Sequence, residues 1–125
     1  MIKKPIDTAG KVAGAPYSVA IDTGSVVYVS GQVPLDAKTG KLVPGGIKEQ
    51  TEQVFANLRA ALQEAGLSLH HVVKSTVFMS DLGEFGAMNE VYAKQMPAPF
   101  PARSTVQVAA LPLGAKVEIE VVAVR

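Results

Sequence analysis

Arg103 is the residue of this sequence that points most directly to chemistry. It follows the proline-rich stretch at 97–101 and opens a largely apolar segment. A guanidinium is always charged, and its planar fork of donors fits a carboxylate through two hydrogen bonds. Burying it among valines is costly unless an anion meets it. That anion is either the carboxylate of a substrate or an internal partner, Glu118 or Glu120. The sequence leaves both possibilities open.

The rest of the composition argues against several other kinds of site. Cysteine is absent, which excludes thiolate nucleophiles, disulfides and thiolate metal ligands. His70 and His71 are the only histidines, and without a third nitrogen or sulfur ligand they fit a zinc centre poorly, so no metal is expected. The chain has 12 Lys and Arg against 11 Asp and Glu. This balance lacks the basic excess of a nucleic-acid-binding protein.

The organisation of the chain is expected to be simple. Its 125 residues, 48% of them hydrophobic, predict one domain over 1–125 with a substantial core. The segment after Lys3 and Lys4 has no apolar run long enough for a signal peptide or a membrane span. We therefore expect a cytoplasmic protein with no membrane partner.

The first half of the chain predicts a hairpin and a helix. Strands at 18–22 and 26–30 are separated by a short connection that contains Gly24. Apolar residues recur at helical spacing over 47–65, and Gly66 stands where a left-handed C-terminal cap is expected. This amphipathic helix should lie on a sheet.

The second half predicts a strand, a helix and a second hairpin. Residues 72–79 are rich in β-branched side chains and read as a buried strand. Asp81 and Glu84 resemble a capping box that opens a helix ended by Pro97. Two last strands, at 104–109 and 116–124, are joined by a Leu-Pro-Leu-Gly turn at 111–114, as a hairpin would be. The helix carries four large residues on one side: Phe85, Met88, Tyr92 and Met96.

This order of elements predicts an α+β fold in which two helices cover one face of a mixed sheet. Several strands carry apolar residues that point both ways, so the second face also needs a cover. A homo-oligomer packed through the sheet is the simplest solution. A site at the junction between subunits then becomes plausible.

Five segments together resemble a known family: residues 15–18 (APYS), 29–34 (VSGQVP), 73–82 (VKSTVFMSDL), 100–105 (FPARST) and 117–120 (VEIE). Each is weak alone, but their order and spacing are specific. The chain resembles the RidA reactive-intermediate deaminases, once described as endoribonuclease L-PSP. The resemblance spans nearly the whole chain. It implies a chorismate-mutase-like α+β fold, a homotrimer, and sites in clefts between subunits.

The resemblance also implies a reaction. RidA proteins hydrolyse 2-imino acids and their enamine tautomers, such as 2-aminoacrylate, to 2-keto acids and ammonia without a cofactor. Arg103 matches the family arginine that holds the substrate carboxylate. Glu118 matches the glutamate that positions the water and relays its proton, a general acid–base role. Alternation places Glu118 and Glu120 on one face, and a simple hairpin register would set Glu120 opposite Thr105, so periodicity does not choose between the two glutamates.

Four further residues match substrate-binding positions of the family. Tyr17 matches a tyrosine that reaches into the cleft, and Ser30 with Gly31 matches a turn whose carbonyl contacts the imine nitrogen. Asn89 shares a helical face with Phe85 and matches an asparagine that faces the cleft. Without the resemblance, these residues would read as a packed aromatic, a turn or bulge, and a surface amide.

The sequence departs from the family pattern at Thr105, where many members carry cysteine. Thiol chemistry is therefore excluded there, whereas the backbone groups used at that position remain. Ala15 and Val19, where Gly and Gln are common, put the substrate range in question more than the reaction. A trimer that binds 2-keto acids without turnover is the main alternative. The ribonuclease activity of the older family name lacks a second catalytic base, since His70 and His71 are expected to fill a turn.

Overall fold

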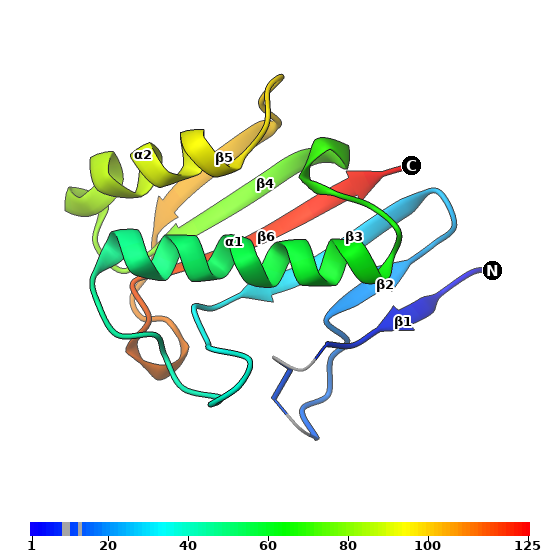
Figure 1. Cartoon of the computed structure of the whole chain (residues 1–125), viewed down its shortest axis with the longest axis horizontal. Helices are drawn as coiled ribbons and strands as arrows, with labels where there is room; N and C mark the ends of the chain where they lie inside the picture. The colour runs from blue at the N-terminus through cyan, green and yellow to red at the C-terminus, as the bar shows by residue number, and fades with distance from the viewer. Residues whose placement is uncertain (9–10, 13) are drawn as a thin grey trace.

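A six-stranded mixed sheet forms the backbone of the fold, with both helices packed on the same face (Figure 1). The computed structural model describes residues 1–8, 11–12 and 14–125. The strands run in the order β1-β2-β3-β6-β4-β5. Their bounds are Lys4–Ile6 (β1), Ala20–Asp22 (β2), Val26–Gln32 (β3), Val72–Met79 (β4), Ala102–Gln107 (β5) and Val117–Val124 (β6). The predicted α+β class with two helices on one face is confirmed.

Helix α1, Ile47–Glu64, lies across the middle of the sheet in Figure 1. Five of its apolar side chains are fully buried: Ala61 and the larger Val54, Phe55, Leu58 and Leu62. Burying side chains of this size stabilises a fold by about 1.5–3 kcal/mol each. The helix ends as the sequence predicts, because Gly66 adopts φ +74° and the Leu67 N–H donates to the Leu62 carbonyl.

Helix α2, Phe85–Gln95, follows a 3₁₀ turn at Leu82–Glu84. The predicted capping box is wrong in one half. The Asp81 carboxylate does accept the Gly83 N–H, at 2.8 Å, but the Glu84 carboxylate accepts a hydrogen bond from the Lys116 ammonium, at 3.2 Å. An opposite charge within reach competes with the backbone for this carboxylate.

The predicted hairpin between the last two strands is also wrong. β5 pairs with β4 in parallel, β4 pairs with β6 antiparallel, and β4 therefore lies between the two strands. The connection at 108–116 crosses the end of β4 with a 3₁₀ turn at Pro112–Gly114. Thr105 is consequently in register with Val77 of β4 and, beyond it, with Ile119 of β6 rather than with Glu120.

The two faces of the sheet differ in their covering. The helix-covered face holds the core, with Val77, Ile119 and Val121 at most 2% exposed. The opposite face carries Tyr28 at 54% exposure and Val106 at 41%. Large apolar side chains thus remain open to solvent on the face that the sequence predicts to need a second cover.

Candidate active site

Arg103 lies on the edge strand β5, on the face covered by helix α2. Its Nη1 donates a hydrogen bond of 2.7 Å to the Asn89 side-chain oxygen. The guanidinium carbon lies 4.5 Å from the centre of the Tyr92 ring and 5.5 Å from that of Phe85. Arginine stacks favourably on aromatic faces in this way. The cation is therefore oriented by a neutral amide and two rings, none of which neutralises its charge.

Helical spacing explains why these partners converge. Phe85, Asn89 and Tyr92 are four and three residues apart on α2, which places them along one face. The Tyr92 hydroxyl is fixed in turn by a 2.6 Å hydrogen bond to the Ser75 hydroxyl on β4, the strand beside β5. Helical spacing predicts that Asn89 shares a face with Phe85, but it does not predict that the rings of Phe85 and Tyr92 stack on the arginine. An arginine near an aromatic helix face was the available signal.

A groove of about 370 Å³ opens beside the Arg103 side chain. It is lined by Asn89, Tyr92, Ala93, Phe100, Pro101 and Arg103. A positive charge at the wall of a groove that also offers apolar side chains suits a small carboxylic acid, whose anionic end meets the guanidinium.

Among the described side chains, Arg103 forms no ion pair with Glu118 or Glu120, so this possibility, which the sequence leaves open, is wrong. Arg103 is in register with Ser75 and then Val121, on the helix-covered face. Glu118 is in register with Phe78, on the other face. Within the described part of the chain, Arg103 takes part in no ion pair.

Thr105 lies two residues after Arg103 on the same face of β5. Its hydroxyl oxygen is buried and has no hydrogen-bond partner among the residues that the structure describes. A buried hydroxyl without a partner is unfavourable. The side chain therefore adds an unused polar group next to the arginine.

Glu118, on the open face, packs directly against Gly31. A β-carbon at position 31 would overlap the Glu118 Oε2 atom, so only glycine permits the close approach. The β3–β6 register shifts between Val29 and Gln32, which marks an irregularity at this point. Burial, and next the nearby Glu120 carboxylate, raises the pKa of Glu118 above its ordinary value.

Tyr17 and Ser30 lie on the segments that flank this glycine. The Ser30 hydroxyl donates to the Ser18 carbonyl at 2.7 Å, and the Ser30 backbone N–H donates to the Val19 carbonyl at 2.8 Å. These two hydrogen bonds connect β3 to the segment that carries Tyr17. Tyr17 is 41% exposed, and its hydroxyl accepts a long hydrogen bond of 3.4 Å from the Val12 N–H. Its ring is thus accessible from outside the chain.

The seven candidate residues therefore form two groups. The first, the Arg103 group, is Arg103, Asn89 and Thr105 on the helix-covered face; the second, the Glu118 group, is Glu118, Gly31, Ser30 and Tyr17 around the irregular end of β3. The structure brings residues together within each group but does not bring the two groups together in one chain. The first group offers carboxylate binding, and the second offers a carboxyl with a raised pKa for proton transfer.

Comparison with known proteins identifies the family. Residues 8–125 match the family model described as Endoribonuclease L-PSP. The chain belongs to this family, which includes the RidA proteins. It is similar to a solved structure of RidA from the Antarctic bacterium Psychrobacter sp. PAMC 21119, with a TM-score of 0.92, 44% identity, and coverage of 98% of this chain and 99% of that one.

Curated relatives carry different names. A mouse protein named 2-iminobutanoate/2-iminopropanoate deaminase is 44% identical, over 100% of this chain and 93% of the relative. A Myxococcus xanthus protein named DfrA is 48% identical, over 99% of this chain and 97% of the relative. The predicted membership of the RidA family is confirmed. Because relatives within the family carry different names, membership alone does not identify the reaction.

The remaining predictions concern metal and membrane. His70 and His71 lie in a 3₁₀ turn at Leu69–His71, as predicted, and the His71 Nδ1 accepts the Ser68 N–H at 3.1 Å. In the described ranges, no three His, Asp or Glu side chains form a metal-binding group. No helix there is long and apolar enough to cross a bilayer. For this RidA-family chain, the cytoplasmic location stays a prediction.

Proposed function

We propose that the protein is a homotrimeric deaminase that hydrolyses 2-imino acids and their enamine tautomers to 2-keto acids and ammonia. The observation that carries the proposal is the state of Arg103. Its charge is oriented by the neutral Asn89 amide and by aromatic rings, and no carboxylate of the described chain pairs with it. Such an arginine is prepared to receive the carboxylate of a ligand. The name of the mouse relative supplies the class of ligand.

The position of the two groups supports a site between subunits. A sheet separates the Arg103 group from the Glu118 group, so one substrate touches both only if the second group comes from another copy of the chain. The open face offers Tyr28 and Val106 as apolar contacts for such a copy. A trimer is the closed assembly that we infer from the family resemblance.

Each group has a distinct task in the proposed reaction. Arg103 holds the substrate carboxylate and thereby fixes the plane of the adjacent C=N group. Glu118 orients a water molecule and accepts one of its protons as the oxygen attacks the imine carbon. Glu118 returns that proton to the nitrogen, which gives the neutral carbinolamine. Glu118 then accepts the proton of the new hydroxyl group and transfers it to the amino nitrogen as the C–N bond breaks. Ammonia leaves, and the carbon retains the water oxygen as the ketone of a 2-keto acid.

The other candidate residues shape the same site. Asn89 positions Arg103, and Ser30 with Gly31 presents backbone carbonyls to the imine nitrogen. Thr105 offers backbone groups and its unused hydroxyl, and Tyr17 contacts the substrate from the neighbouring segment. No cofactor or metal is required, because an imine is already electrophilic.

A coupled assay tests the proposal. A serine-eliminating enzyme generates 2-aminoacrylate, and the rate of pyruvate formation is followed with the wild type, Arg103→Ala and Glu118→Gln. We expect the wild type to accelerate hydrolysis. Loss of charged hydrogen bonds worth about 1.5–3 kcal/mol each in Arg103→Ala, and of the proton carrier in Glu118→Gln, should lower kcat/KM by roughly 10²–10⁴.

The rival function would give a different result. If the wild type leaves the uncatalysed rate unchanged but binds pyruvate in an Arg103-dependent manner, the protein is a 2-keto acid sensor. If it cleaves RNA at low salt instead, the older family name describes its activity. Lys38→Gln, in an exposed loop, is the control for nonspecific effects of charge removal.

A further inference from the structure

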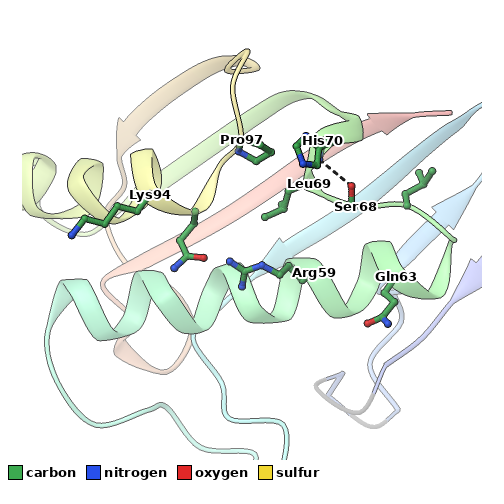
Figure 2. Close-up of a pocket in the computed structure, with 9 residues that line it drawn as sticks. Arg59, Gln63, Ser68, Leu69, His70, Lys94 and Pro97 are labelled. Atoms are coloured by element: carbon green, nitrogen blue, oxygen red, sulfur yellow. Dashed lines mark hydrogen bonds between the residues drawn. The ribbon is translucent and has the colours of Figure 1, made fainter.

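A second hollow lies on the helical side of the molecule, apart from the groove beside Arg103. Figure 2 shows it between α1, the end of α2 and the connection from α1 to β4, with Arg59 and Gln63 projecting from α1 and Lys94 from α2. Its volume is about 520 Å³, larger than that of the Arg103 groove. The two cavities have no lining residue in common.

The rim of this hollow is cationic. Arg59 and Lys94 line it from two different helices, and His70 closes the side formed by the 3₁₀ turn (Figure 2). In Figure 2, the Lys94 side chain extends along α2 with its ammonium group directed away from His70 and Pro97. Neither Arg59 nor Lys94 forms an ion pair or a side-chain hydrogen bond with the described residues, and no acidic side chain is among the lining residues. Glu90, one turn before Lys94, is bound to Lys48 at 2.7 Å.

The α2 helix dipole explains Lys94 in part, because a cation in the last turn of a helix is stabilised there. The helix dipole does not explain Arg59 in the same way, because Arg59 lies before the last turn of α1. An exposed arginine is common on a helix surface. One that shares a cavity of this size with a second unpaired cation creates a local positive potential.

The base of the hollow is apolar. Leu67 and Leu69 are 9% and 7% exposed, and Pro97 packs at the edge. Gln63, Gln95 and the Ser68 hydroxyl add neutral polar groups around them, although the Ser68 hydroxyl already accepts the His70 N–H at 3.3 Å. The combination of an apolar base, neutral polar groups and a cationic rim is typical of sites for small organic ligands with an anionic group.

We propose that this hollow binds small organic anions that combine an apolar body with a carboxylate, sulfonate or phosphate group. The apolar body lies on Leu67, Leu69 and Pro97, and the anionic group meets Arg59, while Lys94 adds to the positive charge at the rim. The site is separate from the proposed deaminase site and does not depend on that function.

Titration of the full-length protein with 1-naphthyl phosphate tests the proposal, with amide chemical shifts as the readout. We expect saturable binding at one site per chain, with the largest shifts at Leu69 and His70. The uncharged 1-naphthol and inorganic phosphate should each bind more weakly, since each lacks one half of the ligand. The double variant Arg59→Gln/Lys94→Gln should weaken 1-naphthyl phosphate binding about tenfold, as expected for the loss of two exposed positive charges.

Two control variants make the test specific. Lys38→Gln/Lys41→Gln removes the same charge from an exposed loop and should leave the affinity unchanged. Arg103→Ala should also bind normally, which separates this site from the deaminase groove. The proposal is overturned if 1-naphthyl phosphate does not saturate, if the Arg59/Lys94 variant binds like the wild type, or if either control variant weakens binding equally.

Discussion

Arg103 and Glu118 lie on opposite faces of one sheet and are supported in opposite ways. The guanidinium has a hydrogen-bond acceptor and two aromatic rings around it. Within the described chain, the Glu118 carboxylate has no hydrogen-bond partner, and it packs against Gly31 and lies near a second carboxylate, Glu120. The cation is held in place without being neutralised, whereas the acid is crowded and its charge is disfavoured.

The different surroundings of Arg103 and Glu118 indicate what each residue contributes to a complete site. A rigid, unneutralised cation can bind a carboxylate without reorganisation, which is the condition for precise orientation of a substrate. A carboxyl with a raised pKa is better suited to exchange a proton than to hold an anion. The two groups are therefore complementary, but they can act on one molecule only across a subunit boundary.

The first prediction separates the two groups onto different chains. Arg103→Ala and Glu118→Gln are each expected to be nearly inactive. If a site uses Arg103 of one subunit and Glu118 of the next, random mixed trimers contain an intact pair at about one quarter of their sites. Co-expression or co-refolding of the two variants should then restore about a quarter of the wild-type rate of 2-aminoacrylate hydrolysis.

The control for this experiment is each variant mixed with itself. Mass spectrometry of differently tagged subunits verifies that mixed assemblies form. Activity that stays at background in verified mixed trimers contradicts a site shared between subunits. Light scattering that shows a stable monomer contradicts it more directly.

Much of the fold that positions these groups could be predicted from local sequence. The strand at 72–79 matches β4 to the residue, and Gly66 ends α1 as expected, because both depend on side chains close in sequence. The pairing of β5 could not be predicted in this way. A parallel strand pair is set by packing over the whole sheet, and the Leu-Pro-Leu-Gly turn at 111–114 resembles a hairpin turn although it crosses an intervening strand.

The residues of the candidate site could be proposed from the sequence, but their arrangement in space could not. The candidate residues came from the family resemblance, and their catalytic roles stay predictions. Periodicity alone could not reveal that β4 separates Arg103 from Glu118 in space, since this follows from the strand order. The stacking of Tyr92 on Arg103 depends on how α2 packs over the sheet edge, which local sequence does not determine.

The second prediction tests whether the cation must stay unneutralised. Asn89→Asp keeps the shape of the side chain but places a carboxylate where an oxygen now lies 2.7 Å from the Arg103 Nη1. An internal ion pair would then compete with the substrate carboxylate. We expect KM in the coupled assay to rise about tenfold or more, with a smaller effect on kcat.

Two variants control for other effects of this substitution. Asn89→Ala removes the acceptor without adding charge and should raise KM less than Asn89→Asp. Gln95→Glu adds a negative charge to the same helix, away from the groove, and should leave KM unchanged. An equal rise in KM with Gln95→Glu would attribute the effect to net charge rather than to Arg103.

The third prediction concerns the crowding of Glu118. In Gly31→Ala, the added methyl group would overlap the Glu118 carboxyl, so the side chain must move away. We expect kcat/KM to fall about tenfold, while the free energy of unfolding falls by only about 1 kcal/mol because a flexible side chain can yield. Gly86→Ala is the matched control, since nothing lies within 4 Å of its added carbon and alanine favours helix by up to about 1 kcal/mol. Wild-type activity in Gly31→Ala would show that catalysis does not depend on the position of the Glu118 carboxyl.

The last prediction is the smallest in effect and concerns the raised pKa of Glu118. Above the ordinary glutamate pKa of 4.5 and below the raised folded-state value, the native protein binds more protons at this site than the unfolded chain does. The Glu118 contribution to stability therefore falls as pH rises through this interval. Glu118→Gln removes the titration, so its free energy of unfolding relative to wild type should increase between pH 4 and pH 7. The change should stay below about 1 kcal/mol, because the carboxyl is only half-buried and solvent screens it.

Urea midpoints at a fixed protein concentration measure the difference, and Glu120→Gln should reduce the wild-type pH dependence because it removes the neighbouring charge. A difference between Glu118→Gln and wild type that is constant with pH would show that the carboxyl is not destabilised by its surroundings, and the contrast with the well-supported Arg103 would then be lost.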